Sequence, residues 1–253
     1  MKEWIIGRNP IYETLRARRR NYFRLLVAQG VEEKGRLSEI IQLAAQRKVA
    51  VSRVHRQQID SMGEGSQGVA LEVSAYPYVA LADILERARE RDEPPFVLVL
   101  DSLQNPQNLG TLFRTAEAVG IHGVVIPLAR TAGVTPAVVH ASVGASEHLL
   151  VAQSNLAQAL ETLKKEADVW VMGLEGSDEK AKPYHTTRLD GPLAIVVGSE
   201  GEGMRDLVRK HCDLLISLPM MGQVESLNAA VAGSIVLYKA LADRMAKQEK
   251  TGK

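Results

Sequence analysis

Cysteine is nearly absent from this chain of 253 residues, and its scarcity excludes several kinds of structure. The single cysteine, Cys212, cannot form a disulfide within the chain, and one thiolate cannot build a zinc site. The chain also lacks the run of roughly 18 apolar residues that a membrane-spanning helix requires. Its first residues show no apolar core followed by a small-residue cleavage site, as a signal peptide would. We therefore expect a cytoplasmic protein with no membrane partner and no metal.

Net charge is also scarce, since the whole chain carries only +1. Taken alone, this value argues against a nucleic-acid binder that is basic over its whole surface. The charge is unevenly distributed, however. Residues 1–60 hold 13 Lys and Arg against 6 Asp and Glu, which leaves a balance of −6 for residues 61–253. This division favours a basic module for an anionic ligand, joined to an acidic body.

The apolar fraction of 45% and the length predict a globular protein of one large or two smaller domains. Residues 1–75 have the pattern of a small α/β domain. Strands are predicted at 23–28, 49–54 and 69–73. One helix is expected to open at Asn9–Pro10 with Ile11 and Leu15 on its apolar side, and a second to cover 37–46. Residues 76–95 form the predicted linker, in which a short charged helix covers 81–91. The linker ends at Pro94 and Pro95 because proline cannot continue a helix. The second domain is expected over 96–246, followed by a frayed charged tail at 247–253.

The second domain alternates short apolar runs with helical patterns. Runs that are apolar at every position are typical of strands buried on both faces, as in a parallel sheet. Strands are predicted at 96–100, 123–127, 148–152, 169–174, 193–198 and 214–219, and helices at 108–120, 136–144, 154–167, 203–211 and 225–245. Asn108 and Ser154 are the expected N-caps, and Gly120 is the residue expected just beyond a helix end. The fold class is therefore α/β with a parallel sheet covered on both sides.

Three loops follow predicted strands, where ligands bind in sheets of this kind. The first, from Asp101, enters a helix that carries Asn108 and Arg114. Its pattern alone favours a cap and a solvated surface charge. The second, Gly198–Gly203, has the spacing GxxGxG, which is neither GxGxxG nor the phosphate loop. Its glycines allow close backbone approach, and its two acids suit a cationic or neutral ligand. The simpler alternative is a tight glycine turn in which Glu200 and Glu202 are only solvated.

The third loop runs from Leu218 to Asn228 and leads into a helix that has no charged residue up to Tyr238. Its alanines and Gly233 predict close packing against other backbone. In the simplest interpretation, Ser226 and Asn228 only cap that helix. Elsewhere, the histidines show no metal spacing, and Cys212 lacks the supporting group of an activated nucleophile, which favours a structural thiol. The arginines between 16 and 24 are equally consistent with a solvated helix end and with phosphate contacts.

Together the three loops resemble a known family. The segments in question are NLGTLFRTAEAVG, VVGSEGEGM and LPMMGQVESLNAAVA. In this order they resemble the three motifs of the SpoU branch of the SPOUT methyltransferases, and IIGRNPIYETLRA resembles the L30e-like substrate-binding domain of that family. The resemblance implies a homodimeric enzyme with a trefoil knot in its catalytic domain. It implies S-adenosylmethionine as cofactor, with S-adenosylhomocysteine as product. The implied substrate is a guanosine 2′-hydroxyl in 23S rRNA or a large-subunit precursor.

Carried over to this sequence, the resemblance implies roles for particular residues. The catalytic set is Asn108, Arg114, Glu200, Ser226 and Asn228. The cofactor set is Gly198, Gly203, Leu218, Met220 and Leu227. The basic residues Arg8, Arg18, Arg19 and Arg20 are expected to contact RNA. Because the pKa of arginine exceeds about 12, we expect Arg114 to stabilise a developing alkoxide and to bind a phosphate, with proton abstraction as the alternative.

Three alternatives stay open at this stage. The RNA could be a tRNA, because only the family analogy favours rRNA. The chain could be a non-catalytic ribosome-assembly protein with the same fold, although its polar motif residues are intact. A nicotinamide-dependent oxidoreductase would carry GxGxxG after the first strand of the second domain, and Asp101–Gly110 does not supply it.

Overall fold

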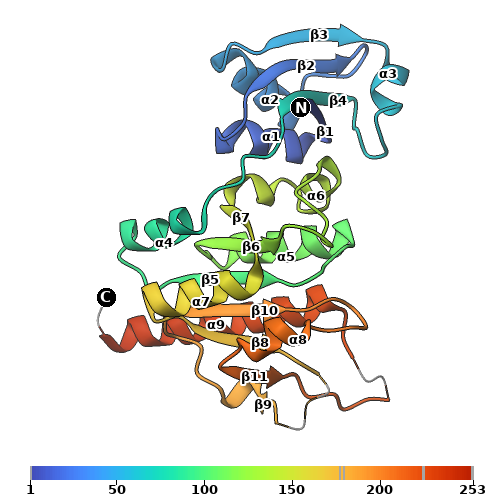
Figure 1. Cartoon of the computed structure of the whole chain (residues 1–253). Coiled ribbons are helices and arrows are strands. Elements are labelled where there is room, and N and C mark those ends of the chain that lie inside the picture. Colours follow the sequence, from blue (N-terminus) through green and yellow to red (C-terminus); the bar gives the residue numbers. More distant parts are fainter. Residues whose placement is uncertain (1, 177, 179, 224–225, 252–253) are drawn as a thin grey trace. The chain divides into compact units, whose positions relative to one another are not determined.

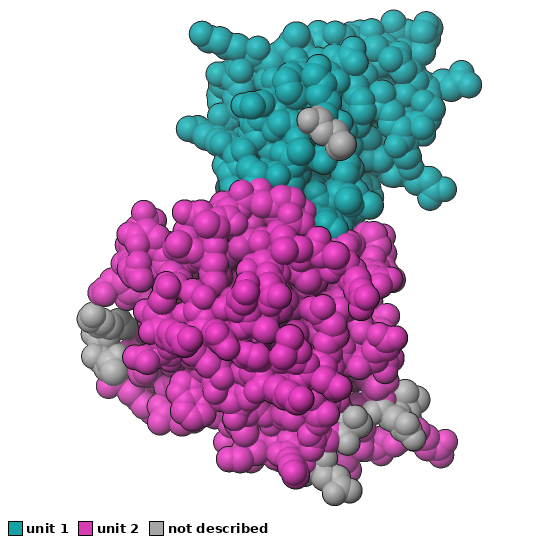
Figure 2. Space-filling view, viewed as in Figure 1, with its two compact units in different colours: residues 1–77, 133–148 teal, residues 78–132, 149–253 magenta. Residues whose placement is uncertain are grey.

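The computed structural model describes residues 2–176, 178, 180–223 and 226–251 and divides the chain into two compact units. Unit 1 comprises residues 1–77 and 133–148, and unit 2 comprises residues 78–132 and 149–253. Figure 1 traces the elements along the chain, and Figure 2 colours the two units. The second segment of unit 1 lies between two strands of unit 2 in the sequence. The polar contacts described below account for its place in unit 1.

Unit 1 is built on a four-stranded mixed sheet in the order β1-β4-β2-β3. Its strands are β1 (Lys2–Ile6), β2 (Tyr22–Ala28), β3 (Ala50–Val54) and β4 (Val69–Ser74). Strand β4 pairs antiparallel with β1 and β2, whereas β2 and β3 run parallel. The sequence predicted the last three strands to within a residue or two. It missed β1, whose apolar residues stand directly before a helix.

Five helical segments complete unit 1. They are α1 (Arg8–Ala17), α2 (Arg36–Gln46), α3 (Arg56–Asp60), α6 (Pro136–Ala141) and the 3-10 turn η1 (Ala145–His148). Ile11 and Leu15 of α1 are fully buried, as the predicted apolar stripe requires. Gly7 precedes α1 with φ 89°, a conformation that favours glycine. Helix α3 was not predicted, since its five residues are too few for a periodic pattern.

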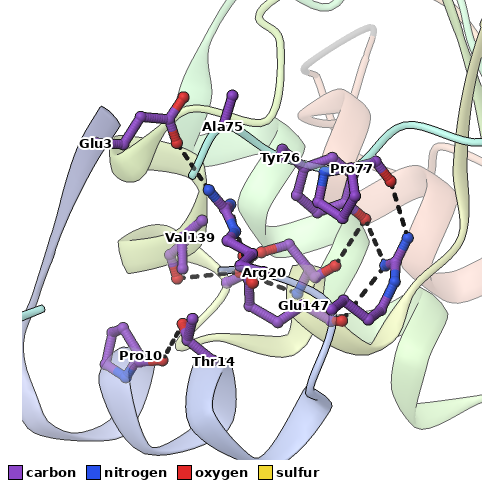
Figure 3. Close-up of polar contacts among 12 residues, drawn as sticks. Glu3, Pro10, Thr14, Arg20, Ala75, Tyr76, Pro77, Val139 and Glu147 are labelled. Atoms are coloured by element: carbon purple, nitrogen blue, oxygen red, sulfur yellow. Dashed lines mark hydrogen bonds and ion pairs between the residues drawn. The ribbon is translucent and has the colours of Figure 1, made fainter. Parts of the chain in front are cut away.

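A buried polar network attaches residues 133–148 to the rest of unit 1 (Figure 3). The Arg20 guanidinium donates to both carboxylate oxygens of Glu147, at 2.9 and 2.8 Å, and to Glu3 at 2.7 Å. The Arg20 and Glu147 side chains are 0% and 1% exposed. Arg19 donates to the Tyr76 hydroxyl and to the carbonyl of Glu147. The compact units therefore do not follow the predicted boundaries at 75 and 96.

The sheet of unit 2 has seven strands in the order β7-β6-β5-β10-β8-β11-β9. They are β5 (Phe96–Leu100), β6 (Gly123–Pro127), β7 (Val151–Ser154), β8 (Trp170–Leu174), β9 (Lys182–Pro183), β10 (Leu193–Val197) and β11 (Leu214–Ser217). Every neighbouring pair is parallel. The predicted α/β class is confirmed. The trefoil knot stays a prediction.

Helices cover both faces of this sheet. One face is covered by α5 (Pro106–Ala118) and α9 (Ala229–Thr251), which also pack on each other. The opposite face is covered by α4 (Leu81–Glu90), α7 (Leu156–Ala167) and α8 (Asp206–Lys210). A 3-10 turn, η2, spans Tyr184–Thr186. A Cβ at Gly233 of α9 would lie 2.7 Å from the Leu112 side chain of α5 and 3.1 Å from that of Val197. The helix is therefore closely packed, but Gly233 faces side chains and not the backbone that the sequence predicted. Helix α4 falls inside the predicted linker, where Ile84 and Leu85 are buried.

Several helix ends differ from the prediction. Asn105, and not Asn108, caps α5: its side chain accepts from the Gln107 N–H at 2.8 Å and Pro106 takes the first helical position. Asn155, and not Ser154, caps α7. Gly120 follows α5 with φ 72°, as expected. Helix α9 continues to Thr251 through most of the predicted tail, and residues 252–253 lie outside the described part. Among the helices described, none is both long and apolar enough to span a membrane.

Candidate active site

The loop after β10 brings backbone into unusually close contact at Gly198. A Cβ built on Gly198 would lie 2.3 Å from the carbonyl carbon of Gly203 and 2.4 Å from the Met204 nitrogen. The loop closes on itself through two backbone hydrogen bonds between Ser199 and Gly203, at 3.0 and 3.1 Å. Gly201 and Gly203 have φ of 88° and 67°. The glycine-rich pattern is therefore required by this geometry, since side chains would clash or be strained there.

The Asn228 side chain joins the three motif loops. Its Nδ2 donates to Asn108 Oδ1 at 3.0 Å and to a carboxylate oxygen of Glu200. Its Oδ1 accepts from the N–H groups of Ala230 and Val231, at 2.9 and 3.2 Å, and so caps α9. Asn228 therefore has both of the roles that the sequence left open, since one amide end caps the helix and the other binds the motif residues.

A cavity of about 710 Å³ lies beside this cluster, within unit 2. Its walls come from the ends of β8, β10 and β11 and from the start of α9, at the carboxyl edge of the sheet. All five residues of the predicted cofactor set line it, together with three of the catalytic set: Gly198, Gly203, Leu218, Met220 and Leu227, with Glu200, Ser226 and Asn228. Asn108 reaches the site through its bond to Asn228.

Three further charged residues of the wall were not predicted, namely Glu175, Asp206 and Arg209. Arg209 pairs with Asp178, and hydrogen bonds from the Lys180 N–H and from Arg209 hold the pKa of Asp178 below its ordinary value. With Glu200 and Glu202, the wall carries four carboxylates against one guanidinium. This excess of acids favours a cationic ligand. The position of Glu175 directly after β8 is the one signal that could have identified it.

Arg114 stands apart from this assembly. It lies on the exposed side of α5, does not line the cavity, and has no hydrogen-bond or ion-pair partner in the described part of the chain. Asn108, six residues earlier, is buried because it lies on a different side of the helix. The predicted catalytic set is therefore only partly brought together within one chain.

Only some of the arginines predicted to contact RNA are accessible in unit 1. The prediction that Arg20 contacts RNA is wrong, because its guanidinium is buried and ion-paired. Arg20 therefore stabilises the fold and presents no charge to RNA. Arg19 is half-buried and also donates to the Pro77 carbonyl at 3.0 Å. Arg18 is exposed at the end of α1, and Arg8 lines a small cavity at its start. The basic sequence cluster therefore contains both structural and accessible arginines.

Two groups that the sequence set aside are structural. Burial raises the pKa of the Cys212 thiol to about 12, which keeps it protonated at neutral pH. His122 accepts from the Phe96 N–H at 2.9 Å and contacts Glu93, and burial lowers its pKa. Within the described ranges, His, Cys, Asp and Glu form no group that could hold a metal ion.

Two family models match most of this sequence. The model of the SpoU rRNA Methylase family matches residues 95–238, and that of the RNA 2′-O ribose methyltransferase substrate-binding domain matches residues 4–79. The chain belongs to the SpoU family of RNA 2′-O-ribose methyltransferases.

Relatives cover nearly the whole chain. The Bacillus subtilis protein YacO, whose name places it in the TrmH family of tRNA/rRNA methyltransferases, is 44% identical over 94% of both chains. The 23S rRNA (guanosine-2′-O-)-methyltransferase RlmB of Pseudomonas putida is 38% identical over 97% of this chain and 98% of its own. The SpoU methyltransferase AviRb of Streptomyces viridochromogenes, solved with AdoMet, is 21% identical. It has a TM-score of 0.80 over 97% of this chain and 91% of its own. This last likeness shows the shared fold.

Proposed function

We propose that this enzyme uses S-adenosylmethionine to methylate the 2′-hydroxyl of a guanosine in 23S rRNA, as the name of the similar RlmB protein describes for that relative. The observation that carries the proposal is the cavity at the carboxyl edge of the sheet. The second and third motif loops line it, and the hydrogen bond from Asn228 to Asn108 joins the first motif to it. The basic first part of the chain supports an RNA substrate. The domain assignment follows, with RNA docking on residues 1–75 and transfer on residues 96–246.

The cavity fits this cofactor in size and charge. Small-molecule sites typically span about 300–1,000 Å³, and the cavity lies within that range. S-adenosylmethionine supplies a methyl group on a positively charged sulfonium. The carboxylates of Glu175, Glu200, Glu202 and Asp206 favour a positive ligand. Gly198, Leu218 and Leu227 offer backbone groups in the wall, and the missing Cβ at Gly198 leaves room for the Gly203–Met204 backbone.

The remaining polar residues would orient the ribose and manage its hydroxyl proton. Asn228 is held rigidly because it caps α9 and contacts Asn108 and Glu200. Ser226 is exposed beside it and is free to contact the nucleotide. Arg114 would bind a phosphate of the target and stabilise the negative charge that develops on the 2′-oxygen. A side chain outside the cavity can do this only from another chain or after a movement.

A homodimer would supply Arg114 from the partner. Four apolar side chains are exposed along one side of α9: Val231, Ile235, Tyr238 and Met245, at 36–53%. Thr111, Arg114 and Ala118 are exposed along α5, which α9 contacts through Thr115 and Ser234 at 2.8 Å. A two-fold partner packed on this surface would cover the apolar side chains. Tyr238→Glu should then produce a monomer in analytical ultracentrifugation, and a variant that remains dimeric would argue against this surface.

The direct test is methyl transfer by the purified full-length protein. S-adenosylmethionine with a tritiated methyl group would be incubated separately with 23S rRNA and with tRNA, each unmodified. Nuclease digestion would then identify the labelled nucleoside. We expect 2′-O-methylguanosine from the rRNA alone. Label in tRNA would favour a tRNA substrate, which the name of the relative YacO also mentions. RNA binding without transfer to either substrate would favour the non-catalytic alternative.

A further inference from the structure

Unit 1 contains a second, smaller cavity that the methyl-transfer site does not use. Its volume is about 250 Å³, and it is lined by Arg8, Val31, Arg56 and Gln67. Arg8 begins α1, Val31 follows β2, Arg56 begins α3, and Gln67 lies in the loop before β4. Four segments that are distant in sequence therefore meet at one point of unit 1, and two of them contribute guanidinium groups.

The polar groups of this cavity are arranged as donors. The Arg8 backbone N–H donates to Gln67 Oε1 at 2.9 Å, which occupies the amide oxygen and leaves the Gln67 NH₂ as a donor. The Arg8 Nε is buried, and no described residue accepts its hydrogen. Arg56 donates from its Nε to Asp60 at 3.3 Å, so the hydrogen bond to that carboxylate does not use its terminal nitrogens. A ligand that satisfies these donors must present acceptor atoms and negative charge.

The loop is held in a strained conformation that presents Gln67. Gln67 has φ 52°, in the left-handed region, and stands between Ser66 and Gly68. Ser66 is buried and donates to Asp60 at 2.6 Å, which fixes the loop to α3. The acidic residues near Val31 are already paired: Glu33 contacts Arg53, and Glu32 contacts Lys34 at 3.1 Å.

We infer that this cavity binds a phosphodiester of the RNA substrate, with Arg8, Arg56 and Gln67 as its donors. The inference rests on the proposed function, because RNA is the polyanion that this enzyme would bind. A base would present both donors and acceptors along its pairing edge, whereas the guanidinium groups of Arg8 and Arg56 only donate. The phosphate contact would position the RNA and would read no sequence. Arg56 and Gln67 therefore join Arg8 as expected RNA contacts.

The test compares full-length variants for affinity to a 23S rRNA fragment over a series of salt concentrations. Arg8→Ala and Arg56→Ala should each weaken binding about tenfold and reduce the slope of log K against log salt by about 1, since each removes a phosphate contact. Gln67→Ala should weaken binding about threefold with an unchanged slope, because it removes a neutral donor. The matched control is Arg16→Ala, which removes an exposed arginine of α1 that pairs with Glu13; we expect a change below about twofold.

The result separates this site from the proposed function. S-adenosylmethionine affinity should stay at the wild-type level in the Arg8, Arg56 and Gln67 variants, because the cofactor cavity lies in unit 2. The control Arg16→Ala should also keep wild-type methyl transfer. Wild-type affinity and slope in Arg8→Ala and Arg56→Ala would overturn the phosphate site and leave the proposed function standing. Absence of methyl transfer by the wild-type protein would overturn the proposed function, while the binding data would still test the site. Circular dichroism would confirm folding, and Arg8→Lys, which keeps the charge, should retain the salt slope.

Discussion

Unit 1 and unit 2 each contain a polar cluster, one around Arg20 and the other around Asn228. The sequence associated Arg20 with RNA and Asn228 with catalysis. The two clusters differ in how many of their hydrogen bonds are made inside the protein. In unit 1, the Arg20 guanidinium is shared among Glu3, Glu147 and the Ser74 carbonyl, and it is closed to solvent. In unit 2, Asn228 is anchored, but Glu200 and Ser226 stand beside an open cavity. The first cluster is saturated, and the second retains capacity for a ligand.

This difference shows how burial decides what a charged residue does. Arginine and glutamate that are buried together must satisfy each other, since an unpaired buried charge is strongly unfavourable. The same residue types at the edge of a cavity keep unused donors and acceptors. The charge of +7 in residues 1–60 is therefore only partly available to RNA. Each prediction below tests one side of this comparison.

The largest expected effect is on the saturated cluster. Glu147→Ala should lower the free energy of unfolding by about 3–5 kcal/mol, because it leaves the Arg20 guanidinium buried with only part of its partners. Chemical denaturation would measure the loss. The matched control, Arg20→Met with Glu147→Leu, should recover most of the stability because both charges are removed together. A loss below about 1 kcal/mol for Glu147→Ala would mean that the network is dispensable.

The same network predicts the outcome of a truncation. Removing residues 1–75 takes away Arg20, so Glu147 loses its ion-pair partner. A stable catalytic fragment should therefore require that residues 133–148 be replaced by a flexible linker as well. We expect the simple truncation to aggregate and the doubly altered fragment to bind S-adenosylmethionine by calorimetry. Equal solubility of the two fragments would contradict the assignment of residues 133–148 to unit 1.

The next effect concerns Arg114. Arg114→Ala should reduce kcat by about 100- to 1,000-fold, as the loss of a transition-state donor does, with unchanged S-adenosylmethionine affinity because Arg114 lies outside the cavity. If Arg114 acts from the partner chain, mixing Arg114→Ala with Asn228→Ala protein should restore about a quarter of the activity. Half of the random dimers are then mixed, and each has one intact site. No recovery would place Arg114 in the site of its own chain.

A smaller effect should follow from adding one carbon to the cavity wall. Gly198→Ala forces the Gly203–Met204 backbone to move, at a cost of about 1–3 kcal/mol, and should weaken S-adenosylmethionine binding at least about tenfold. Gly191→Ala is the matched control, because its Cβ would have no neighbour within 4 Å. Calorimetric titration of both variants would measure the difference. Equal affinities would show that the loop does not shape the cofactor site.

The smallest effect separates the two roles of Asn228. Asn228→Ala removes the cap of α9 and should cost about 1 kcal/mol of stability, whereas Asn228→Ser keeps a capping oxygen and should cost less. Both variants lose the bonds to Asn108 and Glu200 and should lose activity to a similar extent. Thermal unfolding and methyl transfer would be measured together. If Asn228→Ser kept more activity than Asn228→Ala in proportion to its greater stability, capping α9 would be the only role of Asn228.

The elements and loops of unit 2 could be predicted because buried parallel strands have a plain apolar signature. The five cofactor residues were predicted from the resemblance to the SpoU family. They line one cavity because the loops after β10 and β11 leave the same edge of the parallel sheet. The burial of Arg20 could not be predicted, because its partner Glu147 is 127 residues away and nothing in the local pattern links them. The same limit applies to Asn228 and Asn108, and to Glu175 and Arg209 in the cavity wall. Sequence spacing gave the residue types, and only the fold shows which of them are saturated.

The most direct test of the central claim is a map of ribose methylation in the rRNA and tRNA of cells that lack this protein. Mass spectrometry would compare them with the same cells complemented by the wild-type chain or by Arg114→Ala. We predict that one 2′-O-methylguanosine of 23S rRNA disappears without the protein, returns with the wild-type chain and stays absent with Arg114→Ala. An unchanged 23S rRNA map together with a lost tRNA methylation would contradict the rRNA assignment. Unchanged maps for both RNAs would contradict the proposed function.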